Sequence, residues 1–310
     1  MLKRSSIIVS MNKLTTADRV RVVSALVEGN SIRATVRMTG VAKNTVAKLL
    51  VDLGKACAEY HDKHVRNVKA TRIQCDEIWS FCHAEQKNVP AEHQGEFGYG
   101  DIWTWTALAS ESKLIVSYLV GLRDGGYATE FIRDVASRLA DRVQLTTDGH
   151  KAYLEAVEDA FGGDIDYARL VKLYGAERAG EARYSPAVCI GTRTNTISGD
   201  PDPRHVSTSY VERQNLTMQM SMRRFTRLTN AFSKKVEYLE YAVAIHYLYY
   251  NFVRLHQTLR VTPAMEAGLS DHVWEIEELV ALLEKEEQMA IDAGAMKRGK
   301  YRIKDQENPK

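Results

Sequence analysis

The first clear pattern in the chain is a series of apolar residues at helical spacing. Between residues 14 and 27 they recur every three or four positions, and Thr15 or Thr16 is available to cap the helix. A second short helix is predicted over 31–38, and Gly40 then makes a tight turn into a third helix over 43–53. The inner face of this third helix is formed by Val46, Leu49, Leu50 and Leu53. Helices in this order and spacing are typical of a helix-turn-helix domain.

From residue 71 the pattern changes to one of strands. Residues 71–82 alternate and are rich in β-favouring side chains, and two further strands are joined by a short turn at 110–112. The predicted elements are strands at 71–82, 101–109 and 113–120, a helix at 127–140, a strand at 143–147, a helix at 150–161 and a strand at 166–173. Consecutive hairpins followed by helix-linked crossovers predict a mixed sheet with helices on its faces.

The rest of the chain supplies an irregular segment and further helices. Glycine and proline residues punctuate 174–206, which is predicted to be an insertion loop. Helical patterns return later and end in an acidic amphipathic helix before a polar tail; they cover 208–224, 233–253 and 270–289. The predicted organisation is 1–10 as a disordered or misassigned start ahead of Met11, 11–56 as the helix-turn-helix domain, 57–70 as a linker, 71–260 as the α/β catalytic domain and 261–310 as a C-terminal helix and tail.

Composition excludes several classes of protein. The 310 residues are 45% hydrophobic and 26% charged, which is ordinary for a globular chain. No apolar run approaches the roughly 20 residues that a membrane-spanning helix needs. Four cysteines in a chain of this length do not form a disulfide framework. Secreted, membrane-spanning and disordered readings are excluded, and a cytoplasmic protein is expected.

Charge is strongly segregated along the chain. Residues 1–75 carry a net charge of +9, 76–212 of −9, 213–260 of +6 and 261–310 of −4. Basic segments on either side of an acidic centre indicate contacts with nucleic acid around a carboxylate-rich site. The residues expected to read DNA are those at the start of the third helix, namely Lys43, Asn44, Thr45 and Lys48. The alternative is a small three-helix bundle that does not touch nucleic acid.

Three carboxylates are the candidates for chemistry. Asp76 lies in the middle of an otherwise apolar strand, Asp148 at the end of a buried strand, and Glu212 near the start of a helix. Each has a structural alternative: a solvent-facing strand residue, a turn residue, and a first-turn acid favoured by the helix dipole. The order of elements allows the first and fourth strands to be neighbours, which would bring the two aspartates together. Unpaired carboxylates that converge repel one another unless cations neutralise them, and oxygen ligands suit Mg²⁺ or Mn²⁺.

Four short motifs carry a resemblance to a known family. They are Cys75-Asp76-Glu77-Ile78-Trp79, Thr146-Thr147-Asp148-Gly149-His150, Tyr210-Val211-Glu212-Arg213-Gln214-Asn215, and Tyr250-Asn251-Phe252-Val253-Arg254-Leu255-His256 followed by Thr262-Pro263. With the helix-turn-helix ahead of them, the chain resembles bacterial insertion-sequence transposases of the DDE class, and among these the insertion sequence one family. The resemblance implies an integrase-like RNase H fold for the α/β domain.

The same resemblance implies the activity. Asp76, Asp148 and Glu212 would hold two divalent ions, Mg²⁺ or Mn²⁺, for water-mediated strand cleavage at the element's ends. The exposed 3′-hydroxyl would then attack a phosphodiester of the target DNA. The implied partners are the terminal inverted repeats, target DNA and further copies of the chain in a homo-oligomer, and the implied location is the bacterial nucleoid.

Two details complete the prediction. Glu77 is left out of the site because alternation along a strand points it to the opposite face from Asp76. Basic residues after Glu212 are expected to follow the DNA phosphates, and they include Arg213, Arg223, Arg224 and Arg227. Two other functions stay open: another RNase H-fold nuclease acting on hybrids or junctions, and a transposase-derived DNA-binding protein without activity.

Overall fold

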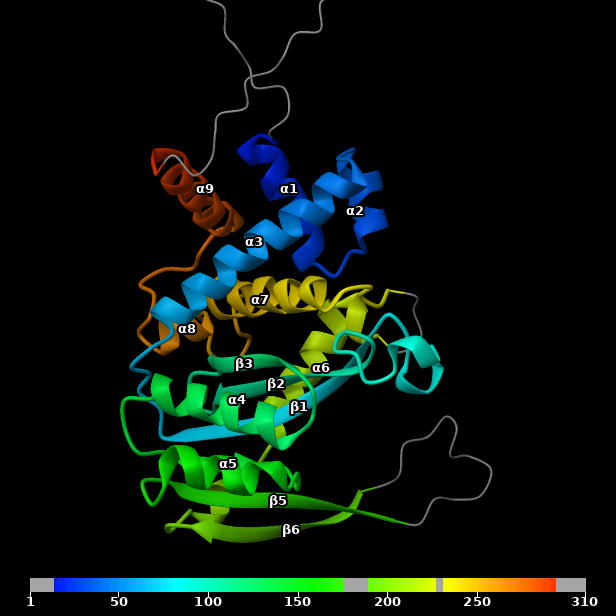
Figure 1. Cartoon of the computed structure of the whole chain (residues 1–310). Coiled ribbons are helices and arrows are strands. Elements are labelled where there is room, and N and C mark those ends of the chain that lie inside the picture. Colours follow the sequence, from blue (N-terminus) through cyan, green and yellow to red (C-terminus); the bar gives the residue numbers. More distant parts are fainter. Residues whose placement is uncertain (1–13, 176–188, 227–230, 294–310) are drawn as a thin grey trace, which may run out of the picture.

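The computed structural model describes residues 14–175, 189–226 and 231–293. It is a mixed α/β protein in which one sheet is flanked by helices, and a group of further helices lies to one side (Figure 1). The predicted start region 1–10 and most of the polar tail fall outside the described residues, as does Arg227. Within the part of the chain that is described, no helix combines the length and apolar character needed to cross a membrane.

Three N-terminal helices form where the sequence predicts them. They are α1 (Thr16–Val27), α2 (Ile32–Thr39) and α3 (Lys43–His64). Thr15 caps α1 by accepting a hydrogen bond from the amide of Asp18, and Ser31 caps α2 in the same way through the amide of Ala34. Gly40 ends α2 in the left-handed conformation that glycine adopts without a steric cost.

The third helix is longer than the pattern predicts. The third helix was predicted over 43–53, with a helical tail and linker after it; α3 continues to His64 and so includes part of the predicted linker, 57–70. Gly54 lies in the middle of α3, where this helix packs closely against α7 (Val236–Phe252). A Cβ at this position would lie 2.2 Å from the Cβ of Tyr241, so glycine is required by packing. Contacts with α7 and with α9 (Ile276–Asp292) keep the second half of α3 helical.

Six strands form a single mixed sheet. They are β1 (Arg72–Cys82), β2 (Gly100–Ala109), β3 (Ile115–Gly121), β4 (Gln144–Thr147), β5 (Asp166–Tyr174) and β6 (Cys189–Ser198). Their order across the sheet is β3-β2-β1-β4-β5-β6, and β1 and β4 are parallel neighbours. The two hairpins, β1–β2 and β2–β3, are antiparallel, as is β5–β6. This topology is consistent with an RNase H-like domain.

The strand β6 corrects one expectation. Residues 174–206 were predicted to be irregular, yet β6 occupies part of that range and pairs with β5. The alternating β-branched residues Thr192, Thr194 and Thr196 favour a strand, and the glycines on either side obscured this signal. Residues 176–188 of the same range lie outside the described residues.

Two hydrophobic cores lie on opposite faces of the sheet. On one face α4 (Gly125–Arg138) and α5 (Ala152–Phe161) cover the odd-numbered residues of β1, such as Ile73 and Cys75. On the other face α6 (Ser209–Ser221) and α7 cover Ile78. Burial on both sides explains why apolar residues occur on both faces of β1, and why the charged side chains in the middle of the strand stand out.

The N-terminal helices pack on the rest of the chain. Helix α3 lies along α7, and α9 contacts both α1 and α3 (Figure 1). Arg19 of α1 is almost fully buried and pairs with Glu284 and Glu287 of α9. The short helix α8 (Pro263–Glu266) also packs on α7, and four 3₁₀ turns complete the described structure: Gln86–Asn88, Ala91–His93, Pro203–His205 and Arg223–Phe225.

Candidate active site

Helix α6 is fixed to the central strand by a buried glutamine. The Oε1 atom of Gln74 accepts hydrogen bonds from the amides of Tyr210 (2.9 Å) and Val211 (3.1 Å). These amides belong to the first turn of α6, where no partner within the helix exists. The side chain of Thr208, the N-cap residue of α6, makes no capping hydrogen bond to these amides. The beginning of α6 is therefore held two residues from Asp76 on β1.

Asp76 lies on the face of β1 that α6 covers. Its Oδ2 atom accepts a hydrogen bond of 2.9 Å from Nδ2 of Asn215, nearly two turns into α6. Burial raises the pKa of Asp76 to about 7, and the negative charges of Glu77, Asp148 and Glu212 act in the same direction. An aspartate this costly to ionise in the metal-free chain is typical of a site where a cation belongs.

Asp148 arrives beside Asp76 because of strand pairing. Thr147 at the end of β4 lies opposite Cys75 of β1, so the next residue along each parallel strand is an aspartate. The Oδ1 atom of Asp148 accepts a hydrogen bond of 2.8 Å from the amide of His150, which orients the carboxylate. This is the carboxyl end of a parallel strand, where open α/β sheets usually place their ligands.

The structure adds Glu77 to this cluster. Single ligand atoms of Asp76, Glu77 and Asp148 all lie within 4.8 Å of one another. The argument that excluded Glu77 does not hold at this position: β1 continues past the end of β4, so Asp148 is close to both faces of β1. Glu77 does point the other way, since its Oε2 atom accepts a hydrogen bond from the hydroxyl of Tyr153 on α5 at 3.1 Å.

Arg123 provides a positive charge in the cluster. Its Nε atom donates to Glu77 at 2.8 Å, its Nη2 atom lies 3.4 Å from Asp148, and its guanidinium stacks 4.7 Å from the ring centre of Trp103. Burial and the charge of Asp148 raise the pKa of Glu77 to about 7, against the opposite effect of Arg123. Sequence reasoning gave no signal for Arg123, because it lies in a loop far along the chain from the other residues.

Glu212 lies outside this three-carboxylate group. Its Oε2 atom is 2.6 Å from Nζ of Lys172 on β5, and its Oε1 atom accepts a hydrogen bond from the hydroxyl of Thr208. Glu212 is still close enough for its charge to contribute to the raised pKa of Asp76. The structure thus brings Asp76 and Asp148 together and leaves Glu212 at the edge of the site, paired with lysine.

The residues present fit a divalent cation. Three carboxylates offer oxygen ligands at close range, and among the described residues Arg123 is the basic side chain that pairs with two of them. Oxygen-only ligand sets of this kind suit Mg²⁺ or Mn²⁺. A cation there would relieve the repulsion that raises the pKa values of Asp76 and Glu77.

The residues expected to contact DNA lie in different environments. Lys43, Asn44 and Thr45 are exposed at the start of α3, and Lys48 is exposed while pairing with Asp52. Arg213 is exposed on α6, and Arg223 is exposed in the turn after it. Arg224 is turned inward: its guanidinium donates to Ser233, and burial lowers its pKa to about 10. Arg224 is therefore poorly placed to follow a phosphate chain.

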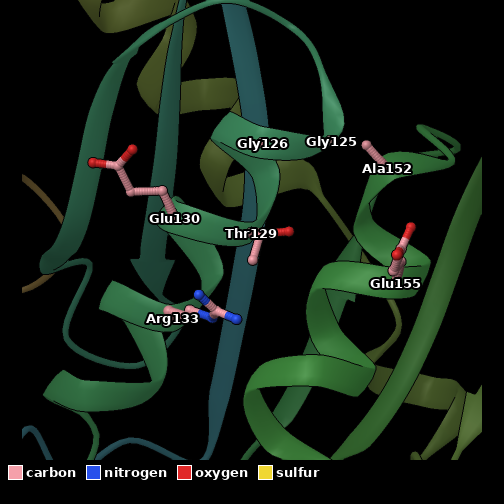
Figure 2. A pocket seen from close by; sticks show the side chains of 7 residues that line it. All are labelled: Gly125, Gly126, Thr129, Glu130, Arg133, Ala152 and Glu155. Atoms are coloured by element: carbon pink, nitrogen blue, oxygen red, sulfur yellow. The ribbon is translucent and has the colours of Figure 1, made fainter.

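A separate pocket of about 580 Å³ lies between α4 and α5. Figure 2 shows its lining, Gly125, Gly126, Thr129, Glu130 and Arg133 from α4 with Ala152 and Glu155 from α5. The carboxylates of the cluster are not part of this lining. Its mixed charges and open shape give no indication of a particular ligand.

Comparison with known proteins yields a distant likeness in structure and none in sequence. No protein-family model matches the chain, and no curated protein matches its sequence. Among solved structures, the cryo-EM structure of a piggyBac transposase synaptic complex with hairpin DNA aligns with 96% of this chain and 77% of that chain. The identity is 12% and the TM-score is 0.38, a likeness too distant to assign a shared family.

Proposed function

We propose that this protein is a DNA transposase of a bacterial insertion sequence, which binds the ends of its element and catalyses strand cleavage and strand transfer. The observation that carries the proposal is the meeting of Asp76 and Asp148 at the carboxyl end of β4. Each belongs to a motif through which the chain resembles DDE transposases. The motif around Glu212 begins on the helix that Gln74 fixes against the same strand.

In the proposed reaction, water attacks a phosphodiester at the element's end and leaves a 3′-hydroxyl and a 5′-phosphate. The 3′-hydroxyl then attacks a target phosphodiester, so one P–O bond forms as another breaks and the leaving oxygen takes a proton. Asp76, Asp148 and Glu212, with Glu77 beside them, would hold the divalent ions. Bound there, Mg²⁺ or Mn²⁺ would supply charge neutralisation and Lewis-acid activation.

Side chains and a backbone amide of the chain itself orient these carboxylates. Asn215 orients Asp76 by donating to one of its oxygens, and the amide of His150 orients Asp148. Arg123 holds Glu77 and Asp148 on its two sides. Exposed residues at the start of α3, chiefly Lys43, Asn44 and Thr45, would contact the element's end, and the complex with DNA would contain more than one copy of the chain.

A cleavage assay tests the proposal. Labelled DNA carrying the sequences on either side of the coding region is incubated with the full chain and Mg²⁺, and nicks are mapped. We expect nicks at the element's ends that leave 3′-hydroxyls. Asp76→Asn, Asp148→Asn and Glu212→Gln should reduce cleavage to the level without protein. The matched control is Asp159→Asn, an exposed acid of α5 paired with Arg133, which should cleave normally.

The other outcomes favour other functions. Cleavage of RNA–DNA hybrids without regard to the element's ends would indicate a different nuclease of this fold. Binding of the ends without any metal-dependent cleavage would indicate a DNA-binding protein that has lost the activity. Normal cleavage by two of the three acidic variants would exclude the proposed site.

A salt titration tests the assignment of α3. Lys43→Ala in the full chain should weaken DNA binding for all sequences and reduce the salt dependence by about one phosphate contact. Asn44→Ala should instead reduce the preference for terminal sequences. Lys63→Ala, at the other end of α3 and paired with Glu59, is the control. If Lys63→Ala changed the salt dependence as much as Lys43→Ala, the start of α3 would not be the DNA-contacting surface.

A further inference from the structure

Both carboxylate oxygens of Glu212 are engaged away from the cluster. One pairs with Lys172 at 2.6 Å and the other accepts from Thr208. Glu212 lies three residues before Asn215 on α6, and Asn215 hydrogen-bonds Asp76. Residues three apart share a helix face, so Glu212 is on the face that looks towards the cluster. A change of side-chain rotamer, without any movement of α6, would alter where its carboxylate lies.

Lys172 is placed where DNA can reach it. Pairing between β4 and β5 ends at Thr147 and Arg169, so Lys172 stands three residues further along β5, beyond the strand end that carries Asp148. Its side chain is 35% exposed, and that of Glu212 is 36% exposed. Ion pairs this open to solvent contribute little to stability and exchange readily. A lysine ammonium binds a phosphate oxygen as well as it binds a carboxylate.

We propose that Lys172 is a phosphate-binding residue that holds Glu212 outside the carboxylate cluster in the DNA-free chain, and that a DNA phosphate replaces Glu212 on Lys172 and releases Glu212 towards the divalent ions. The inference rests on the proposed function, and it makes Lys172 a positioning residue for Glu212. No covalent bond changes: one anion replaces another on the same ammonium group.

Thermodynamic linkage couples metal binding to DNA binding in this proposal. If a phosphate frees Glu212 to act as a metal ligand, DNA must raise the affinity for metal, and metal must raise the affinity for DNA by the same factor. In the DNA-free chain Lys172 competes with metal for Glu212. Removing the lysine charge should therefore improve metal binding when no DNA is present.

Calorimetric titration of the full chain with Mn²⁺ measures this without any catalytic readout. Lys172→Gln should bind Mn²⁺ about two- to fivefold more tightly than the unmodified chain in the absence of DNA, the range expected for losing a partly exposed ion pair. Adding a short duplex that lacks the element's ends should tighten Mn²⁺ binding by the unmodified chain. The gain should be smaller in Lys172→Gln by about the same factor.

Matched variants make the result specific. Lys172→Arg keeps the charge and should behave as the unmodified chain does. Arg193→Gln removes an exposed positive charge from β6 and should change nothing. Lys172→Gln combined with Glu212→Gln should lose the gain in affinity, because the released carboxylate is gone. Thermal melting of each variant checks that the fold is retained.

Failure of this inference is distinguishable from failure of the proposed function. Unchanged Mn²⁺ affinity in Lys172→Gln, with lost affinity in Asp76→Asn and Asp148→Asn, would overturn the role of Lys172 and leave the metal site standing. Unchanged affinity in the two aspartate variants as well would remove the metal site itself. The persistence of the full DNA-induced gain in Glu212→Gln would also overturn the proposal.

Discussion

Asp76 and Glu77 are adjacent carboxyls that both ionise with difficulty in the folded chain. Burial and neighbouring negative charge raise their pKa values to about 7, whereas in the unfolded chain they ionise near pH 4. Between these values the folded state holds protons on these two carboxyls that the unfolded state has lost, so their contribution to stability falls as pH rises from about 4 to about 7 and then levels off. The buried His61 and His246, whose pKa values burial lowers to about 4 and about 3, act in the opposite direction below pH 6.5, so the effect of the carboxyls is measured by replacing one of them.

Replacing Asp76 tests this directly. Asp76→Asn removes one of the repelling charges while keeping an oxygen that can accept from Asn215, and at pH 8 it should stabilise the metal-free chain by about 1–3 kcal/mol. At pH 5 the difference should be clearly smaller, and it should largely vanish below about pH 4, where Asp76 is protonated in both states. Thermal melting of both proteins across this pH range measures the stability difference between them. An equal stability difference at low and high pH would show that ionisation of Asp76 does not cause it.

Removing Arg123 while Glu77 remains should reduce the stability of the fold. The side chain of Glu77 has no exposed surface, so Arg123→Ala would leave a buried carboxylate with only the hydroxyl of Tyr153. We expect a loss of about 2–4 kcal/mol in urea unfolding. Glu77→Gln added to Arg123→Ala should recover much of that loss. Strictly additive effects would mean that the two side chains do not stabilise each other.

At the scale of the element, α6 depends on a side chain from a strand. Gln74→Ala would leave the amides of Tyr210 and Val211 without their acceptor, at a cost of about 1–2 kcal/mol. Because α6 carries both Glu212 and Asn215, we also expect weaker Mn²⁺ binding, measured by calorimetry.

Gln144→Ala is the matched control. Gln144 of β4 binds the backbone of Asp202 through both its amide atoms, at the opposite end of β4 from Asp148. Its loss should reduce stability and leave Mn²⁺ binding unchanged. Equal weakening of Mn²⁺ binding in both variants would show that general loss of stability, and not the position of α6, is responsible.

At the scale of the whole molecule, the N-terminal helices and the sheet domain share hydrophobic packing. Gly54→Ala introduces a Cβ 2.7 Å from the Cα of Tyr241 and should push α3 away from α7, at a cost of about 1–3 kcal/mol in urea unfolding. Gly163→Ala, which meets nothing within 4 Å, should stay within about 0.5 kcal/mol. Similar losses in both variants would argue against tight α3–α7 packing.

The sequence by itself determined the local elements. Apolar periodicity, caps at Thr15 and Ser31 and the turn at Gly40 placed the first three helices, and β-rich runs placed the first five strands close to their observed bounds. These signals are local, because hydrogen bonding and side-chain direction within a helix or strand depend on nearby residues. The same reasoning missed β6, and it did not predict that α3 runs unbroken to His64, where contacts with α7 and α9 extend it.

Tertiary structure decided which side chains meet. The order β1-β4 across the sheet brings Asp148 beside Asp76, seventy-two positions away, and the end of β4 lets Glu77 join them. Arg123 and Lys172 come from a loop and a neighbouring strand, and no spacing in the sequence relates them to the acids they pair with. Ion pairs and carboxylate repulsion depend on distances of a few ångströms, and only the folded sheet fixes distances between residues so far apart in the chain.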